Sequence, residues 1–187
     1  MIKKITLVFA LLLCSVQVAA AGNTLKLDVV TQKGKGTILI RLLPDIAPNH
    51  VKRIKKLTSE GAYDNVAFHR VIAGFMAQTG DVQYANKSRY DHKNAGTGGS
   101  TYPNLYAELS EISFKTGVVG MARNRYIHSA NSQFFIMTET HPNLNGRYTV
   151  VGIVEKGLEL VRKLKSGSQE VKGKVTDPDY IKKASII

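Results

Sequence analysis

Short alternating segments separated by turns and loops dominate this chain, and they restrict its fold more than any other feature. Leu25, Leu27 and Val29 alternate with polar residues, as in a strand with one buried face. Strand patterns recur at 37–43, 66–72, 75–79, 118–122, 133–138, 149–154 and 180–187. Only 51–58 and 158–164 have helical spacing, and a glycine follows each. Many short strands with two isolated helices predict an antiparallel barrel or sandwich, and periodicity leaves both open.

The first 21 residues have the three-part layout of a secretory signal. Lys3 and Lys4 precede an apolar stretch at 5–18, and three alanines at 19–21 occupy the positions that a signal peptidase reads. The apolar stretch is too short to favour a permanent membrane span. We therefore expect residues 1–21 to be cleaved and residues 22–187 to form a single domain in the periplasm. A retained membrane anchor and a lipoprotein attached through Cys14 are the alternatives.

Composition limits the chemistry of the mature chain. Cys14 is the only cysteine, so residues 22–187 can hold neither a disulfide nor a cysteine nucleophile. The five histidines show no paired metal spacing, and no serine lies in a nucleophile elbow. The Gly-Thr-Gly-Gly sequence at 96–99 lacks the Lys-Ser/Thr ending of a phosphate loop. We expect neither a cofactor nor a metal, so catalysis would depend on positioning and hydrogen bonding.

The chain is also strongly basic, with a formal net charge of +12. Removing Lys3 and Lys4 from the 26 basic residues leaves 24 against 14 acidic ones, a net charge of +10. Such a surface attracts polyanions. The basic residues are dispersed, however, and lack the aromatic interleaving of single-strand nucleic-acid binders. We expect a solvated basic surface and no nucleic-acid partner.

The most informative segment is 68–81, FHRVIAGFMAQTGD. An arginine in a largely apolar strand is costly unless its charge is paired or hydrated, so Arg70 alone would indicate a structural salt bridge. The segment, however, resembles the cyclophilin signature F-H-R-x-[IV]-x-x-F-M-x-Q-x-G-D. NSQFFI at 131–136 is similar to the family's S-Q-F-F-I strand. GTGG at 96–99, GMA at 120–122 and LNGRYTVVG at 144–152 also match, in the family's order.

This resemblance extends from about residue 25 to residue 161 and implies a fold and an activity. The fold would be mainly β, a closed eight-stranded antiparallel β-barrel capped by two α-helices. The activity would be peptidyl-prolyl cis–trans isomerisation of proline-containing polypeptides, assisting the folding of exported proteins. By position, Arg70 is the catalytic arginine and Gln78 orients the substrate backbone. The predicted substrate-binding residues are Phe75, Met76, Phe134 and Leu144 in the proline pocket, and Ala122, Arg123, Gln133 and Tyr148 along the groove.

Several positions depart from the family pattern. Asn143 stands where many members carry the tryptophan that binds cyclosporin A, so we expect weak cyclosporin binding. Tyr148 replaces a histidine common in eukaryotic members, and Arg123 replaces the usual asparagine. The tyrosine, the exported start and the lack of inserted loops resemble the bacterial periplasmic branch, and we expect a monomer. As an alternative, the protein would be a non-catalytic module that binds proline-containing segments, or a chaperone of the cell envelope. Docking on polyanions is a weaker alternative.

Overall fold

The structure, a computed structural model, describes residues 22–187, and the predicted signal at 1–21 lies outside the described residues. Within residues 22–187 it contains nine strands, two α-helices and two 3-10 turns. In chain order these are β1 (Thr24–Thr31), β2 (Gly34–Leu42), α1 (Pro48–Ser59), β3 (Val66–Ala67), β4 (Arg70–Ile72), β5 (Met76–Thr79), η1 (Lys87–Arg89), β6 (Val118–Met121), β7 (Phe134–Met137), η2 (Pro142–Leu144), β8 (Val150–Lys156), α2 (Leu158–Arg162) and β9 (Tyr180–Ile186).

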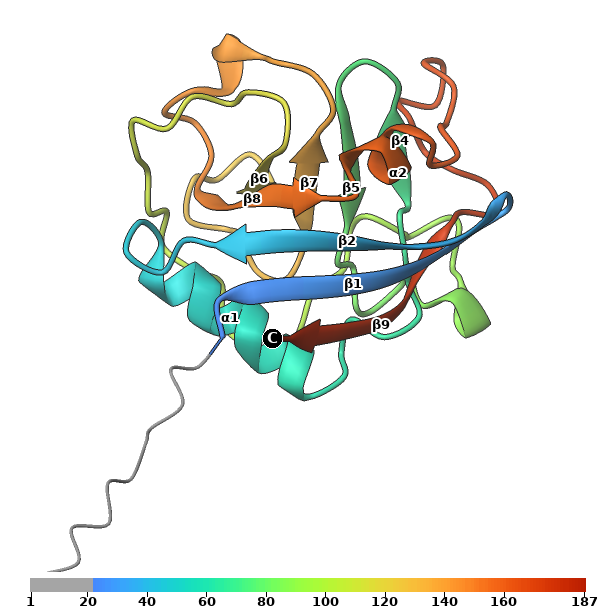
Figure 1. Ribbon diagram of the computed structural model, residues 1–187, viewed down its shortest axis with the longest axis horizontal. Helices are drawn as coiled ribbons and strands as arrows, with labels where there is room; N and C mark the ends of the chain where they lie inside the picture. The colour runs from blue at the N-terminus through green and yellow to red at the C-terminus, as the bar shows by residue number, and fades with distance from the viewer. Residues whose placement is uncertain (1–21) are drawn as a thin grey trace, which may run out of the picture.

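The strands form one curled antiparallel sheet in the order β3-β9-β1-β2-β8-β6-β7-β5-β4. β9, β1, β2 and β8 cross the front of the molecule in Figure 1, and β7 and β5 run steeply behind them. β1 and β2 form the expected hairpin, in which Leu27 pairs with Ile38 and Leu25 with Ile40. The curl places the front and rear strands face to face, so that their inward side chains share one interior.

The expected closed barrel of eight strands is wrong in both count and closure. The segment predicted as one strand at 66–72 divides at Phe68 and His69, because its two ends pair with opposite edges of the sheet. β3 pairs with β9, whereas β4 pairs with β5. Within residues 22–187, no ladder joins β3 to β4, and the covalent chain itself links the two edges. The result is a nine-stranded half-barrel.

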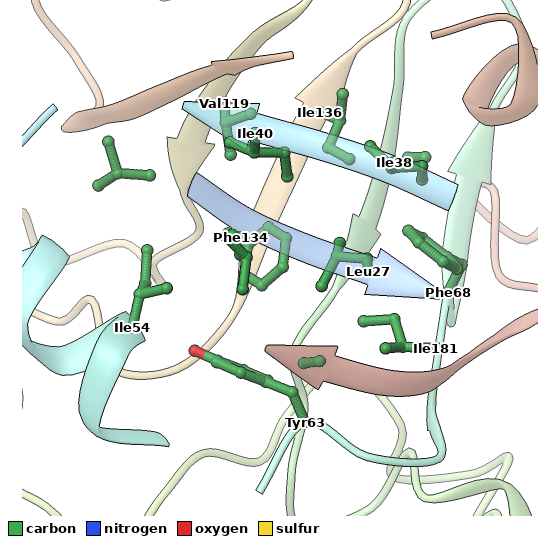
Figure 2. Packing of buried hydrophobic residues seen from close by; sticks show 14 of the residues in the cluster. Leu27, Ile38, Ile40, Ile54, Tyr63, Phe68, Val119, Phe134, Ile136 and Ile181 are labelled. Carbon is green, nitrogen blue, oxygen red and sulfur yellow. The ribbon is translucent and has the colours of Figure 1, made fainter. Parts of the chain in front are cut away.

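The main core fills the concave side of this sheet. Leu27, Ile38, Phe134 and Ile136 are fully buried there, and Figure 2 shows them between the front strands and β7. Helix α1 begins at Pro48, a residue that suits a first helical position because it needs no N–H partner. Its apolar face packs against β9, while α2 packs against β2. The two helices predicted from periodicity are therefore confirmed.

A second apolar cluster lies on the outer face of β5, β6 and β7. Side chains alternate across a strand, so Phe134 and Ile136 face the main core whereas Phe135 and Met137 face this second cluster. Phe114 and Leu144 cover it from the segments that connect the strands. A long connection joins β5 to β6, and only the short η1 interrupts it. In the described part of the chain, no helix is long and apolar enough to cross a membrane.

Candidate active site

Arg70 and Gln78 lie directly opposite each other on β4 and β5. Opposed residues of an antiparallel pair share one face, and here that face is the outer one. Arg70 Nη1 donates to Gln78 Oε1 at 3.2 Å and contacts Met76 Sδ at 3.8 Å, while Arg70 Nε donates to the Lys172 carbonyl at 3.0 Å. The guanidinium is thus held from two sides, and partial burial lowers the pKa of Arg70 below its usual value. It still carries its charge at neutral pH.

A chain of hydrogen bonds supports Gln78 from behind. Gln78 Nε2 donates to Gln133 Oε1 at 2.8 Å, and Gln133 Nε2 donates to the carbonyls of Gly96 and Gly98 at 3.1 and 2.7 Å. The buried carboxylate of Asp81 accepts from the N–H groups of these same two glycines, at 2.7 and 3.0 Å. Buried polar groups that are fully paired hold one geometry. The predicted GTGG block therefore anchors Gln133, and Gln133 orients Gln78.

Three aromatic rings form an apolar wall beside Arg70. Phe135 stacks on Phe114, with ring centroids 5.8 Å apart, and meets the Tyr148 ring edge-on at 5.5 Å. Gly120 makes this packing possible, because a Cβ there would lie 2.6 Å from Phe135 Cζ and 2.7 Å from Phe114 Cε1. The glycine of the predicted GMA block is therefore needed for close approach of the two rings.

These groups surround a hollow of about 120 Å³, called the first hollow below. Its small volume and the apolar side chains in its lining suit one small ring rather than a folded partner. A second hollow of about 530 Å³ adjoins it along Gly96 to Ser100 and is also lined by Gln133. Gln78, Ala122 and Arg123 border both hollows. The first hollow is lined by Arg70, Phe75, Met76, Gln78, Ala122, Arg123, Phe135, Leu144 and Tyr148.

The placement of Phe134 in this pocket is wrong, and Phe135 takes its place. Phe134 is fully buried in the main core, where its ring meets Tyr63 edge-on at 5.6 Å. Phe135 pairs across the sheet with Gln78 and therefore shares its outer face. The sequence contains a pattern that indicates Phe135. Gln133 was already assigned to the groove, and strand alternation puts Phe135, two residues further on, on the same side.

Loops supply the remaining parts of the rim. Leu144 ends the short η2 turn beside the first hollow, with the neighbouring Asn143 exposed. Phe75 lies in the turn between β4 and β5, and its ring packs against His141 at 4.6 Å. The guanidinium of Arg123 lies over the Tyr148 ring, 4.6 Å from its centroid. Of the nine other predicted site residues, eight line the first hollow, and Gln133 lines the second.

The chemistry available here is that of a fixed cation beside an apolar pocket. His69, which precedes Arg70 in the sequence, is buried, and burial lowers its pKa to about 4, so it stays neutral at neutral pH. Among residues 22–187, no group of three or more histidine, aspartate or glutamate side chains is placed to hold a metal ion. The site offers two guanidinium donors, two amide side chains and a pocket for a small apolar ring.

Comparisons with known proteins identify the family of this chain. The family described as "Cyclophilin type peptidyl-prolyl cis-trans isomerase/CLD" matches residues 26–186. A "Probable peptidyl-prolyl cis-trans isomerase" of Brucella suis is 52% identical over 178 residues, which is 95% of this chain and 90% of that protein. Peptidyl-prolyl cis-trans isomerase B of Bacillus subtilis is 37% identical over 131 residues, or 70% of this chain and 84% of that one.

Solved structures show the same likeness in three dimensions. A Cryptosporidium parvum cyclophilin-type isomerase, crystallised in the presence of the dipeptide Ala-Pro, superposes with a TM-score of 0.71 at 27% identity. The superposition covers 88% of this chain and 98% of that chain. The chain described here therefore belongs to the cyclophilin-type peptidyl-prolyl cis–trans isomerase family. Its activity is the interconversion of cis and trans X-Pro peptide bonds.

Proposed function

We propose that Arg70 is the catalytic group and that the first hollow holds the proline ring of the substrate. The observation that carries this assignment is the fixed guanidinium at the edge of an apolar pocket, held by Gln78 and the Lys172 carbonyl. Phe75, Phe135 and Leu144 would contact the ring. The Cryptosporidium relative was crystallised in the presence of the proline-containing dipeptide Ala-Pro, which agrees with a proline-containing substrate.

The reaction needs only a donor that acts on the twisted amide. Rotation about an X-Pro bond crosses a barrier of about 18–20 kcal/mol because amide resonance is lost at the midpoint. There the prolyl nitrogen regains a lone pair. A guanidinium directed at that nitrogen stabilises the twisted state and finds no comparable acceptor in the planar ground state. The pocket immobilises the ring while Gln78 holds the preceding backbone, so rotation is confined to one bond.

Isomer exchange on an X-Pro peptide, measured by NMR, tests the role of Arg70. Arg70→Ala should lower kcat/KM about 100-fold, because losing one preorganised donor costs roughly 2.7 kcal/mol. Arg70→Lys should restore little, since an ammonium lacks the planar donor geometry. Arg41→Ala is the matched control, because Arg41 is exposed on β2, pairs with Glu155 and borders neither hollow.

Peptide affinity, taken from chemical-shift titration of the same samples, separates an enzyme from a binding module. We expect affinity to fall far less than the rate in Arg70→Ala, because the pocket and Gln78 hold the ground state. Near-normal exchange in a folded Arg70→Ala variant would refute the assignment. A loss of affinity as large as the loss of rate would make Arg70 a ground-state contact and favour the proline-binding module.

The place of action that we propose is the periplasm, with exported proteins as folding clients and a monomer as the working form. The charged start, the apolar stretch and the alanines at 19–21 support export. Cleavage before Gly22 would also leave every described strand intact, since β1 begins at Thr24. The intact mass of the exported protein tests the proposal. A mass that starts at Gly22 is expected, and Met1 retained in a membrane fraction would overturn it.

A further inference from the structure

The two hollows carry an unbalanced positive charge. Arg70 and Arg123 are the only charged residues that line either of them, and no aspartate or glutamate does so within residues 22–187. Neither guanidinium forms an ion pair with a carboxylate in the described chain. Arg70 is assigned to the reaction itself. Arg123 therefore remains as a charge that the catalytic step does not use.

Arg123 is held in place without being neutralised. Its Nε and Nη2 donate to the Arg147 carbonyl at 3.2 and 2.9 Å, and its Nη1 donates to the Asn124 carbonyl at 2.9 Å. The Tyr148 ring supports the guanidinium plane. A guanidinium has five N–H donors, so one N–H on each of Nη1 and Nη2 is left for a ligand. Such a group is preorganised to accept a carboxylate, because little side-chain freedom is lost on binding.

The course of a bound substrate brings its chain past Arg123. If the proline ring occupies the first hollow, the prolyl nitrogen faces Arg70. The preceding residue is bonded to that nitrogen and must leave along Gln78, which pairs with Arg70 and borders both hollows. Ala122 and Arg123 form the rest of that shared border. The one or two residues before the proline therefore pass beside the free donors of Arg123.

We propose that Arg123 makes this enzyme selective for polypeptides with an aspartate or glutamate in the two positions before the proline. The proposal rests on the function proposed above, because it takes the ring position from that assignment. A charge-assisted hydrogen bond to a fixed guanidinium is stronger than a neutral one, but solvent reaches this rim and reduces the gain. We expect a preference of about fivefold for Glu over Gln at the favoured position.

The test compares kcat/KM for matched peptides that carry Glu, Gln or Lys one or two residues before the proline. The unaltered protein should favour Glu over Gln about fivefold and Gln over Lys, and the preference should shrink as salt is raised. In Arg123→Gln the Glu/Gln ratio should fall to near 1. Arg123→Lys should keep part of the Glu/Gln ratio, since lysine retains the positive charge but not the planar set of N–H donors. Circular dichroism verifies the fold of each variant.

Arg125→Gln is the matched control, because it removes the same charge from the same loop. Arg125 Nη2 donates to the neighbouring Tyr126 Oη at 2.7 Å, its guanidinium lies 4.8 Å from the centroid of the same ring, and Arg125 borders neither hollow. In Arg125→Gln the ratio of kcat/KM for the Glu peptide to that for the Gln peptide should stay at about five. A ratio near 1 in the unaltered protein, or equal ratios in Arg123→Gln and Arg125→Gln, would overturn the proposal. Failure of the proposed catalytic role would look different, since it would appear as unchanged turnover of the Gln peptide in Arg70→Ala.

Discussion

Phe134 and Phe135 provide a direct test of which face of β7 forms the substrate pocket. Both are nearly or fully buried and lose the same atoms on truncation to alanine, but they belong to different clusters. Phe134→Ala opens a cavity in the main core and should lower the free energy of unfolding by about 3–5 kcal/mol. For a domain of this size, that loss lowers Tm by roughly 6–20 °C. The kcat/KM of the remaining folded molecules should hardly change.

Phe135→Ala should affect stability less, and substrate binding more, than Phe134→Ala does. Its ring borders the first hollow, so water and the neighbouring Tyr148 can occupy part of the space, and the stability loss should lie near or below about 3 kcal/mol. The proline ring loses one apolar wall. At about 0.8 kcal/mol for each CH₂ group that loses its contact, two such groups correspond to roughly a tenfold rise in KM. The value of kcat should change little, because this contact serves ground state and transition state alike.

Thermal unfolding and isomer exchange on the same samples measure both effects. The milder pair Phe134→Leu and Phe135→Leu serves as a second set if either alanine variant fails to fold. The reasoning would be refuted if Phe134→Ala raised the KM of the folded fraction as much as Phe135→Ala does. That outcome would mean that the rise in KM is not specific to the outer face of β7.

Three further predictions follow from individual side chains. His69 has a folded-state pKa of about 4 against an ordinary 6.5, so below pH 6.5 the unfolded chain binds a proton that the folded one does not. The His69 side chain should therefore lower the free energy of unfolding by about 1.4 kcal/mol for each pH unit between about pH 6.5 and 4. In denaturant titrations, the free energy of unfolding of His69→Asn should depend less steeply on pH. Asp81→Asn should lower the free energy of unfolding by on the order of 2–3 kcal/mol and should also lower kcat/KM, because the carboxylate accepts hydrogen bonds from four backbone N–H groups. Unchanged activity would show that Gln133 needs no support from that loop. Asn143→Trp should strengthen inhibition by cyclosporin A, since the exposed amide at the rim offers neither an indole donor nor a large apolar surface, and equal inhibition constants would contradict this.

The sequence predicted strands such as β1 because they have one buried face, and alternation records that face directly. It did not predict the division of 66–72. Val66 and Ala67 pair with β9, while Arg70 and its neighbours pair with β5. A change of pairing partner leaves no mark on the pattern of polar and apolar residues, because both halves remain partly buried. The closed eight-stranded barrel that the resemblance implied is therefore wrong, whereas the mainly β fold with two α-helices is confirmed.

Some residues of the site are positioned by the sheet, and others are positioned by the loops. Arg70, Gln78 and Phe135 lie on three adjacent strands, in register with one another, and the resemblance came within one residue of identifying all three. The anchoring of Gln133 by a buried carboxylate depends on a loop whose path no periodicity describes. Arg123 likewise depends on two loop carbonyls that hold its guanidinium. Strand register thus places Arg70, Gln78 and Phe135, whereas loop contacts hold Gln133 and Arg123.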